Sequence, residues 1–333
     1  MRRVSQVVVI VLSVVLLLAW GAYRFRTAET TALALESLAA SPGQFVGSSV
    51  GWTHYELAGP DTGRVVVLVH GFSVPSYIWD STSVALAAAG YRVLRYDLMG
   101  RGWSERSDVA YDGDTFDRQL IELLDSLRVT GPVDLMGLSF GGYVTGEFTV
   151  RHPERVRTLT WVDPVASSTR AAGLMRVPVV ARWLFETMAA PTLADGQASD
   201  FLHPERFPDW ADRYRVQMRY RGFARALHRS RHQLQFVEFP TLHAELAATG
   251  TPLLLVWGRE DRTVPFAYAD TIRSRIPRLE LVAVDSAGHL PHMEQPAVVR
   301  AAMLAFLAAH VGTSAGTAAA MPAGAAAPAA GAR

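Results

Sequence analysis

Short apolar runs that alternate with helical stretches constrain the fold of this 333-residue chain more than any other feature. Six of these runs are expected to be strands, and some of them are rich in β-branched residues and almost continuously apolar: 64–69, 91–96, 133–136, 156–162, 252–257 and 279–284. Such runs are typical of strands that are buried on both faces of a parallel sheet. The stretches between and after them are expected to be helices: 81–89, 115–127, 140–152, 265–276 and 296–310. This alternation predicts an α/β fold with a doubly wound, mostly parallel sheet.

Two segments depart from the alternation. Residues 44–58 are expected to form an antiparallel hairpin at the sheet edge. Residues 166–246 are rich in arginine, histidine and aromatic residues and are predicted to be mainly helical. This insertion is either a cap over the sheet or additional packing. The folded domain is therefore expected to span residues 43–311, with the cap insertion at about 166–246.

Residues 1–26 contain a largely apolar segment, and its 17 residues from 7 to 23 carry no charge. That length is at the short end of what spans a bilayer as a helix. Aromatic residues near its end, followed directly by Arg24 and Arg26, favour an uncleaved membrane anchor. The alternative is a signal peptide that is cut near residues 19–21, where a small-x-small pattern occurs.

Either interpretation takes the protein to the membrane or across it. The arginines on the two sides of the segment almost balance, with a slight bias toward a cytoplasmic N-terminus. The folded domain is then expected to be extracytoplasmic, anchored by the helix or secreted after cleavage.

Residues 312–333 form the other unusual end of the chain. They are mostly alanine, glycine, proline and threonine, with no aromatic residue. Such a composition cannot bury enough apolar surface to order itself, so this segment is predicted to be a disordered tail.

The composition excludes several kinds of chemistry. The chain has no cysteine, which excludes thiol nucleophiles, disulfides and thiolate metal sites. It also has no lysine, so all 32 basic residues are arginine, and Schiff-base or phosphate-loop lysines are excluded. The formal net charge of +1 lacks the basic excess of a nucleic-acid binder. The sequence contains no H-E-x-x-H pattern, and neither a metal nor an organic cofactor is expected.

The strongest local motif is Gly137-Leu138-Ser139-Phe140-Gly141, which follows a predicted strand and begins a predicted helix. A serine at a sharp strand-to-helix turn has a strained backbone, and only small residues two positions before and after it avoid a clash. The turn exposes the hydroxyl above the sheet, where the amides of the helix N-terminus face developing negative charge. Ser139 is therefore the candidate nucleophile.

A serine that attacks a carbonyl group needs two backbone N–H donors for the oxyanion. One donor follows the nucleophile directly, and the other comes from a different loop. Phe140 would supply the first donor. His70-Gly71-Phe72 ends the predicted strand 64–69, so Phe72 would supply the second.

The candidate base is a histidine late in the chain. His289 follows a strand and a glycine, which places it on a loop at the edge of the sheet. His292, three residues later, is the less favoured alternative.

The base needs a carboxylate that holds its ring in one tautomer and stabilises its protonated form. Asp261 is preferred because its strand adjoins the one that leads to His289. Asp163, at the end of an earlier strand, stays an alternative, and Glu260 is a weaker one.

Five segments resemble the motifs of the α/β-hydrolase superfamily, and the resemblance covers residues 43–311: 70–72, 97–104, 137–141, 258–265 and 288–289. The order Ser139, Asp261, His289 matches the nucleophile, acid and base of that family. The resemblance implies a core sheet with a helical cap, and it implies that residues 97–104 form a structural loop beside the site. Family branches that cleave carbon–halogen bonds or open epoxides have aspartate as nucleophile, so a serine there implies acyl chemistry.

These features favour a serine hydrolase of carboxylic esters, either a carboxylesterase or a monoacyl lipase-like enzyme. A small ester or lipid-like molecule is the expected substrate, and the N-terminal helix is the expected membrane contact. One alternative is a C–C bond hydrolase of ring-cleavage products. Another is an amide or peptide hydrolase, which would need an acidic cap residue such as Glu186, Asp195 or Glu238 near the substrate amine. The alternative of a different class is a non-catalytic ligand-binding protein with this fold.

Overall fold

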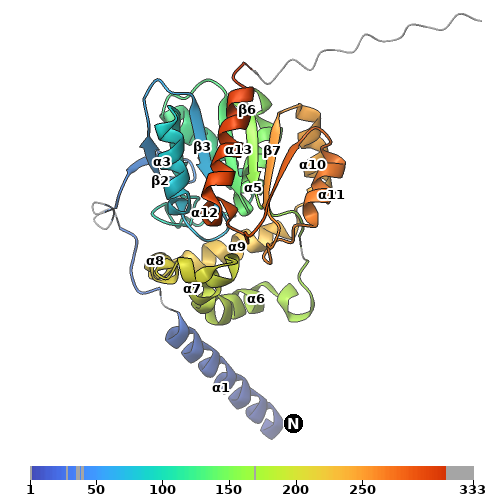
Figure 1. Cartoon of the computed structure of the whole chain (residues 1–333). Helices are drawn as coiled ribbons and strands as arrows, with labels where there is room; N and C mark the ends of the chain where they lie inside the picture. The colour runs from blue at the N-terminus through green and yellow to red at the C-terminus, as the bar shows by residue number, and fades with distance from the viewer. Residues whose placement is uncertain (1, 28, 35–37, 39–40, 169, 313–333) are drawn as a thin grey trace, which may run out of the picture.

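The computed structural model describes residues 2–27, 29–34, 38, 41–168 and 170–312. Its centre is an eight-stranded sheet in the order β1-β2-β4-β3-β5-β6-β7-β8 (Figure 1). The strands are β1 (Gln44–Ser48), β2 (Gly51–Ala58), β3 (Val65–Val69), β4 (Arg92–Tyr96), β5 (Val133–Leu138), β6 (Val156–Val162), β7 (Leu253–Gly258) and β8 (Glu280–Val284). The pairings β1–β2 and β2–β4 are antiparallel, and all the others are parallel. This topology confirms the predicted fold class and the edge hairpin.

Helices cover both faces of the sheet. One face carries α3 (Asp80–Ala88) and α13 (Pro296–Ala309), with the short α12 (Pro291–Glu294) before the latter. The other carries α4 (Gly113–Ser126), α5 (Phe140–Arg151), α10 (Phe239–Thr249) and α11 (Tyr268–Arg275). Neighbouring residues of β3 belong to opposite sides, with Val67 in one apolar cluster and Leu68 in the other. A strand buried on both faces must be apolar at every position, which explains its continuous hydrophobic run.

The cap consists of four helices and several short turns between β6 and α10. The helices are α6 (Pro178–Leu184), α7 (Leu193–Gly196), α8 (Trp210–Met218) and α9 (Phe223–Leu234). The turns are η3 (Gly173–Arg176), η4 (Phe185–Ala189), η5 (Ala190–Thr192), η6 (Gln197–Asp200) and η7 (Pro204–Arg206), while η1 (Ser76–Trp79) and η2 (Pro153–Arg155) belong to the sheet domain. Figure 1 shows the cap at one end of the sheet.

Two expected boundaries differ from the structure. α10 packs against α5 and α11 beside the sheet, so the cap helices end with α9 rather than near residue 246. α11 begins at Tyr268 instead of residue 265, because the preceding residues form a turn in which the Tyr268 N–H donates to the Pro265 carbonyl (3.0 Å).

α1 (Arg2–Arg26) departs from the cap, which lies between it and the sheet (Figure 1). The segment Gln6–Arg26 is long and apolar enough to cross a membrane, and its apolar side chains are exposed. The length and composition of α1 are compatible with a membrane anchor, and the anchor stays a prediction. The predicted tail lies outside the described residues apart from Gly312.

α5 approaches the end of β3 closely at Gly141. A Cβ atom at this position would stand 2.6 Å from the His70 carbonyl oxygen and closer still to that of Val69. Backbone atoms cannot yield as a flexible side chain does, so this position accepts only glycine.

We predict that Gly141→Ala destabilises the protein by about 2 kcal/mol, because the added methyl group forces β3 and α5 apart. Urea unfolding monitored by circular dichroism measures the change. Gly131→Ala is the matched control, since a Cβ atom there meets nothing within 4 Å. Equal stability of the two variants would contradict the close approach.

Candidate active site

Ser139 lies at the sharp turn between β5 and α5. Its backbone has φ 52° and ψ −114°, in the region that residues with a side chain rarely adopt. The turn is held by the Ser139 N–H, which donates to the Val162 carbonyl at the end of β6 (2.9 Å). A Cβ atom at Gly137 would stand 2.5 Å from Thr145 Oγ1, so both glycines of the motif are required by space. The local geometry is that of a strained serine presented at the end of a strand.

Ser139 and His289 line one cavity of about 390 Å³ between the strand ends and the cap. The lining is mainly apolar, and its polar side chains include Gln197, Asp200, Arg231 and Thr263. Its apolar side chains are Phe72, Val74, Ile78, Leu138, Ala189, Leu193 and Leu290. The cavity can therefore hold a small molecule with an apolar portion against the serine hydroxyl.

His289 and Asp261 form a buried hydrogen-bonded pair. His289 Nδ1 lies 2.8 Å from Asp261 Oδ2, and the Asp261 side chain is fully buried. The other Asp261 oxygen accepts hydrogen bonds from the backbone N–H groups of Thr263 (2.8 Å) and Val264 (2.9 Å). Burial lowers the pKa of His289, but the hydrogen bond and charge of Asp261 outweigh it and raise that pKa above its usual value. The carboxylate thus orients the ring and stabilises its charged form.

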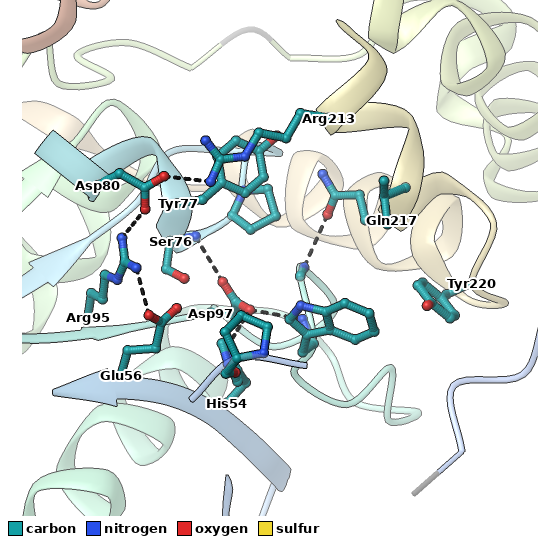
Figure 2. Close-up of a pocket in the computed structure, with 15 residues that line it drawn as sticks. His54, Glu56, Ser76, Tyr77, Asp80, Arg95, Asp97, Arg213, Gln217 and Tyr220 are labelled. Carbon is teal, nitrogen blue, oxygen red and sulfur yellow. Dashed lines mark hydrogen bonds and ion pairs between the residues drawn. The ribbon is translucent and has the colours of Figure 1, made fainter. Parts of the chain in front are cut away.

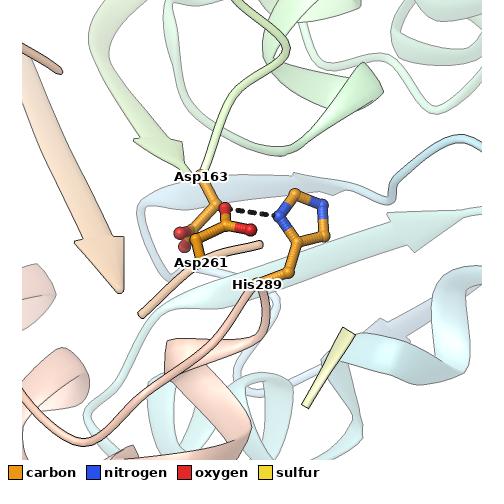
Figure 3. Close-up of side chains that lie close together, drawn as sticks. All are labelled: Asp163, Asp261 and His289. Atoms are coloured by element: carbon orange, nitrogen blue, oxygen red, sulfur yellow. Dashed lines mark hydrogen bonds and ion pairs between the residues drawn. The ribbon is translucent and has the colours of Figure 1, made fainter. Parts of the chain in front are cut away.

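Asp163 lies directly beside this pair (Figure 3). Ligand atoms of Asp163, Asp261 and His289 all fall within 4.8 Å of one another, and all three residues are buried. Asp163 Oδ1 accepts a hydrogen bond from the Gly258 N–H (2.9 Å). Burial, together with the charge of Asp261, raises the pKa of Asp163 well above its usual value. Two adjacent buried carboxyls hold a proton between them, so Asp163 is the neutral partner.

The same three side chains form the group of carboxylates and histidines, among the described residues, whose spacing would suit a metal ion. Asp261 already binds His289 and Asp163 Oδ1 accepts the Gly258 N–H, while Asp163 Oδ2 is buried without a hydrogen-bond partner. Two carboxyls that share a proton and one protonatable imidazole favour a hydrogen-bonded chain over a cation site.

The two weaker candidates lie elsewhere. His292 is buried, its Nε2 lies 3.1 Å from the Ile78 carbonyl, and its ring is 4.6 Å from that of Trp79. Burial lowers the pKa of His292 to about 4, so it stays neutral and structural. Glu260 accepts a hydrogen bond from the Ala287 N–H (3.2 Å) and makes no described contact with the His289 ring.

Phe140 directly follows Ser139, and the loop that contains Phe72 lies close to it. A Cβ atom on Gly71, next to Phe72, would be 3.5 Å from Ser139 Cβ. Phe140 is the first residue of α5, whose first N–H groups have no partner within the helix. Within the described part of the chain, neither backbone N–H donates to a protein acceptor. Both donors are therefore free to bind a ligand oxygen.

Arg101 connects the Phe72 loop to the cap. Its guanidinium donates to the carbonyls of Phe72 and Met99 and to Ser230 Oγ on α9, each at 2.9 Å. The group is fully buried among aromatic rings, and burial lowers its pKa to about 10, so it stays charged at neutral pH. Arg101 thus fixes the loop through hydrogen bonds rather than an ion pair.

Asp97 binds the loops after β3 and β4, and it borders a second cavity of about 290 Å³ (Figure 2). It accepts hydrogen bonds from the N–H groups of Ser76 (2.8 Å) and Trp103 (2.9 Å) and pairs with His54 (2.8 Å). Burial would raise its pKa, but these partners hold it well below its usual value. The charged side chains around this cavity pair with one another, as Arg95 does with Glu56. Ser139 does not line it, so it is not the candidate site.

Two acidic residues near the site were not found by sequence reasoning. Asp200 lines the cavity from the cap, and its carbonyl accepts the His289 N–H (2.8 Å). Glu294, which is buried, accepts hydrogen bonds from the N–H groups of Leu202 (2.9 Å) and Gly288 (2.7 Å). Glu294 thereby joins the cap to the loop that carries His289. Neither residue belongs to a recognisable motif, so only the fold reveals their roles.

The three acidic cap residues considered for an amide substrate do not line the active-site cavity. Each pairs with an arginine instead: Glu186 with Arg182 (2.8 Å), Asp195 with Arg215, and Glu238 with Arg170 (3.0 Å).

We predict that Arg101→Met lowers the free energy of unfolding by about 3 kcal/mol, because two buried carbonyl groups lose their donor. Chemical denaturation at neutral pH measures this loss. Arg278→Met, at an exposed position, is the control and is expected to change stability by less than about 0.5 kcal/mol. An Arg101→Met variant as stable as the control would show that the carbonyls find other donors.

Comparison with known proteins agrees with this geometry. The chain is 28% identical to a pimeloyl-[acyl-carrier protein] methyl ester esterase of Nitrosomonas europaea over 73% of this chain and 94% of that protein. It is 27% identical to a 2-hydroxy-6-oxononadienedioate/2-hydroxy-6-oxononatrienedioate hydrolase of Paraburkholderia xenovorans, over 77% and 90% of the two chains. A solved esterase from Thermogutta terrifontis superimposes with a TM-score of 0.70 at 26% identity, covering 80% of this chain and 100% of that one.

The family model described as "Alpha/beta hydrolase family" matches residues 66–302, which include every residue of the candidate site. The chain therefore belongs to the alpha/beta hydrolase family.

Proposed function

We propose that the protein is a serine hydrolase that cleaves carboxylic esters, with Ser139 as nucleophile, His289 as base and Asp261 as acid. The observation that carries this proposal is the shared cavity: Ser139 lies on a strained turn and faces the same space as a histidine held by a buried carboxylate. This arrangement of nucleophile, base and orienting acid is the one that acyl transfer requires.

The reaction follows from the positions of these groups. Ser139 Oγ attacks the ester carbonyl carbon while its proton passes to His289 Nε2. The free N–H groups of Phe72 and Phe140 stabilise the oxyanion, and His289 then protonates the leaving alcohol as the C–O bond breaks. Water, deprotonated by His289, releases the acid from the acyl-enzyme and restores the Ser139 hydroxyl.

The mainly apolar cavity supports a substrate with an acyl chain or another apolar group. The relatives named above include an esterase and a hydrolase of the C–C type, so the C–C alternative stays open to test. The amide alternative has less support, because the three acidic residues considered for it are paired away from the cavity.

We also infer that α1 is retained as a membrane anchor. Its end contacts the cap through two hydrogen bonds, from Trp183 Nε1 to the Ala19 carbonyl (3.1 Å) and from Arg26 Nε to the Thr187 carbonyl (2.8 Å). A helix that is cut off during export has no need of fixed contacts with the mature domain. Mass spectrometry of the protein from its native membrane tests this inference, and a mature N-terminus after residue 21 would contradict it.

We predict that the full chain in detergent hydrolyses p-nitrophenyl esters with multiple turnovers and that Ser139→Ala lowers kcat by a factor of about 10³ or more. The acyl length that gives the highest kcat/KM reports the size of the apolar cavity. No turnover above that of a folded Ser139→Ala variant would contradict the ester proposal. The C–C alternative would then be tested with a ring-cleavage product in the same assay format.

The two aspartates are predicted to differ in their effect. Asp261→Asn is expected to lower kcat by about 10³–10⁴, because the amide cannot stabilise a charged His289. Asp163→Asn is expected to keep kcat within about threefold, since an amide N–H replaces the carboxyl O–H as donor to Asp261.

The pH dependence of kcat/KM provides the second measurement. Activity falls as pH falls through the raised pKa of His289, because the protonated ring cannot accept the Ser139 proton. In Asp261→Asn the two contributions of Asp261 that raise this pKa are lost, and only the charge of Asp200 still opposes burial, so the acidic limb moves to lower pH. The limb is expected to stay in place in Asp163→Asn. An Asp163→Asn variant as impaired as Asp261→Asn would make Asp163 the acid.

A further inference from the structure

The cap carries an exposed apolar surface that no described part of the protein covers. Residues 172–179 are all exposed, and four of them are large and hydrophobic. With a fifth from η4, they form what we call the cap apolar surface: Leu174, Met175, Val177, Val179 and Met188. Val179 is 78% exposed and Leu174 71%. Four of these side chains lie within six consecutive residues, and exposed apolar side chains that are clustered rather than scattered mark a contact site.

The position of α1 relative to the cap indicates what this surface meets. Trp183 of α6 donates its indole N–H to the carbonyl of Ala19, which lies inside the apolar segment Gln6–Arg26. The first charged residue within that segment is Arg24. It lies five residues after Ala19, which is about 7.5 Å along the helix axis. A bilayer that covers the apolar residues of α1 up to this level therefore reaches the cap at Trp183.

The tether after α1 keeps this geometry fixed. Glu29 accepts hydrogen bonds from the backbone N–H groups of Gly222 (2.7 Å) and Ala224 (2.6 Å) at the start of α9. Arg26 is bonded to η4, which contains Met188. α1 thus meets the cap at two places, and Figure 1 shows α6 on the side of the cap away from the sheet, from which α1 departs.

Charge near the surface also fits a membrane. Arg176 lies among the exposed apolar residues, whereas Arg182, one turn after Val179, pairs with Glu186. Arginine side chains at this level can reach lipid phosphates while the apolar residues enter the boundary of the acyl region. Trp183 has the amphipathic side chain that is enriched at membrane interfaces.

We propose that the cap apolar surface docks on the same bilayer that α1 spans, so that the cap is a second membrane contact of the enzyme. This proposal rests on the retention of α1 as an anchor. It is independent of the reaction proposed at Ser139.

Docking would place the active-site cavity close to the lipid. Ala189, Thr192 and Leu193 line that cavity, and they lie one to five residues after Met188 of the cap apolar surface. A single-chain lipid ester could then reach the cavity from the bilayer without crossing bulk water. In the cap, the residues that contact the membrane and those that line the active-site cavity would then be only a few positions apart in the chain.

The absence of cysteine allows a direct test, because a single introduced cysteine labels one site. We would label Val179→Cys with an environment-sensitive fluorophore, in the full chain reconstituted into vesicles of phosphatidylcholine and phosphatidylglycerol with and without nitroxide lipids. Val311→Cys is the matched control, since Val311 is 68% exposed and follows α13 at the end of the molecule opposite the cap (Figure 1). Leu16→Cys reports on α1 itself.

The label at position 179 is expected to shift its emission to the blue and to lose about half of its intensity to nitroxides placed near the headgroups, because docked apolar faces lie about 5–10 Å into that boundary. The label at position 311 is expected to be unaffected. A label at 179 that behaves like that at 311, while the one at 16 is quenched, overturns the docking. A blue shift without lipid quenching that grows with protein density identifies a second copy as the occupant instead and also overturns it.

Discussion

The close approach of Gly141 to the backbone of β3 is the contact on which the candidate site depends. It brings the start of α5 against the end of β3, so that the loop with Gly71 lies beside Ser139. The proposed oxyanion donors come from these two elements, and they could not face the same point if a side chain separated them. The positive φ of Ser139 is the local cost of that arrangement, and the sheet on either side supports it through the hydrogen bond to Val162.

Buried carboxylates join the loops that follow the strands. Asp97 binds the loop after β4, Asp261 binds the N–H groups of its own loop and the ring of His289, and Glu294 connects the cap to the His289 loop. Each carboxylate is removed from water, and backbone N–H groups replace the lost hydration. Asp163 is the exception, because burial and the charge of Asp261 beside it raise its pKa and favour its neutral form. Asp163 and Asp261 both follow a parallel strand, and they differ in that Asp163 favours its protonated form.

The sequence was sufficient for features that depend on local pattern. Buried parallel strands require continuous apolar runs, and the strained turn requires glycine at 137 and 141, so both could be predicted. The sequence favoured His289 over His292 by its place after a strand and a glycine, and the fold adds a physical reason, because the His292 ring packs against Trp79 and does not line the cavity. Asp200, Arg101 and Glu294 act through contacts between residues distant in sequence, and no spacing rule identifies such contacts. The end of the cap was misplaced because α10 has the same apolar character whether it packs on α5 or on a cap.

The cap has two sides with different surroundings: the inner side faces the active-site cavity, and the outer side is exposed. Its inner side supplies Asp200 and Leu193 to the cavity, and its outer side carries Val179 and the contact of Trp183 with α1. A cap that only enclosed a small cavity would gain nothing from exposing large apolar side chains to water, since each exposed side chain forgoes about 1.5–3 kcal/mol of burial. Such exposure is maintained in a folded protein when the surface has a partner. A bilayer at the level of Trp183 would provide that partner and would also be the source of an apolar ester.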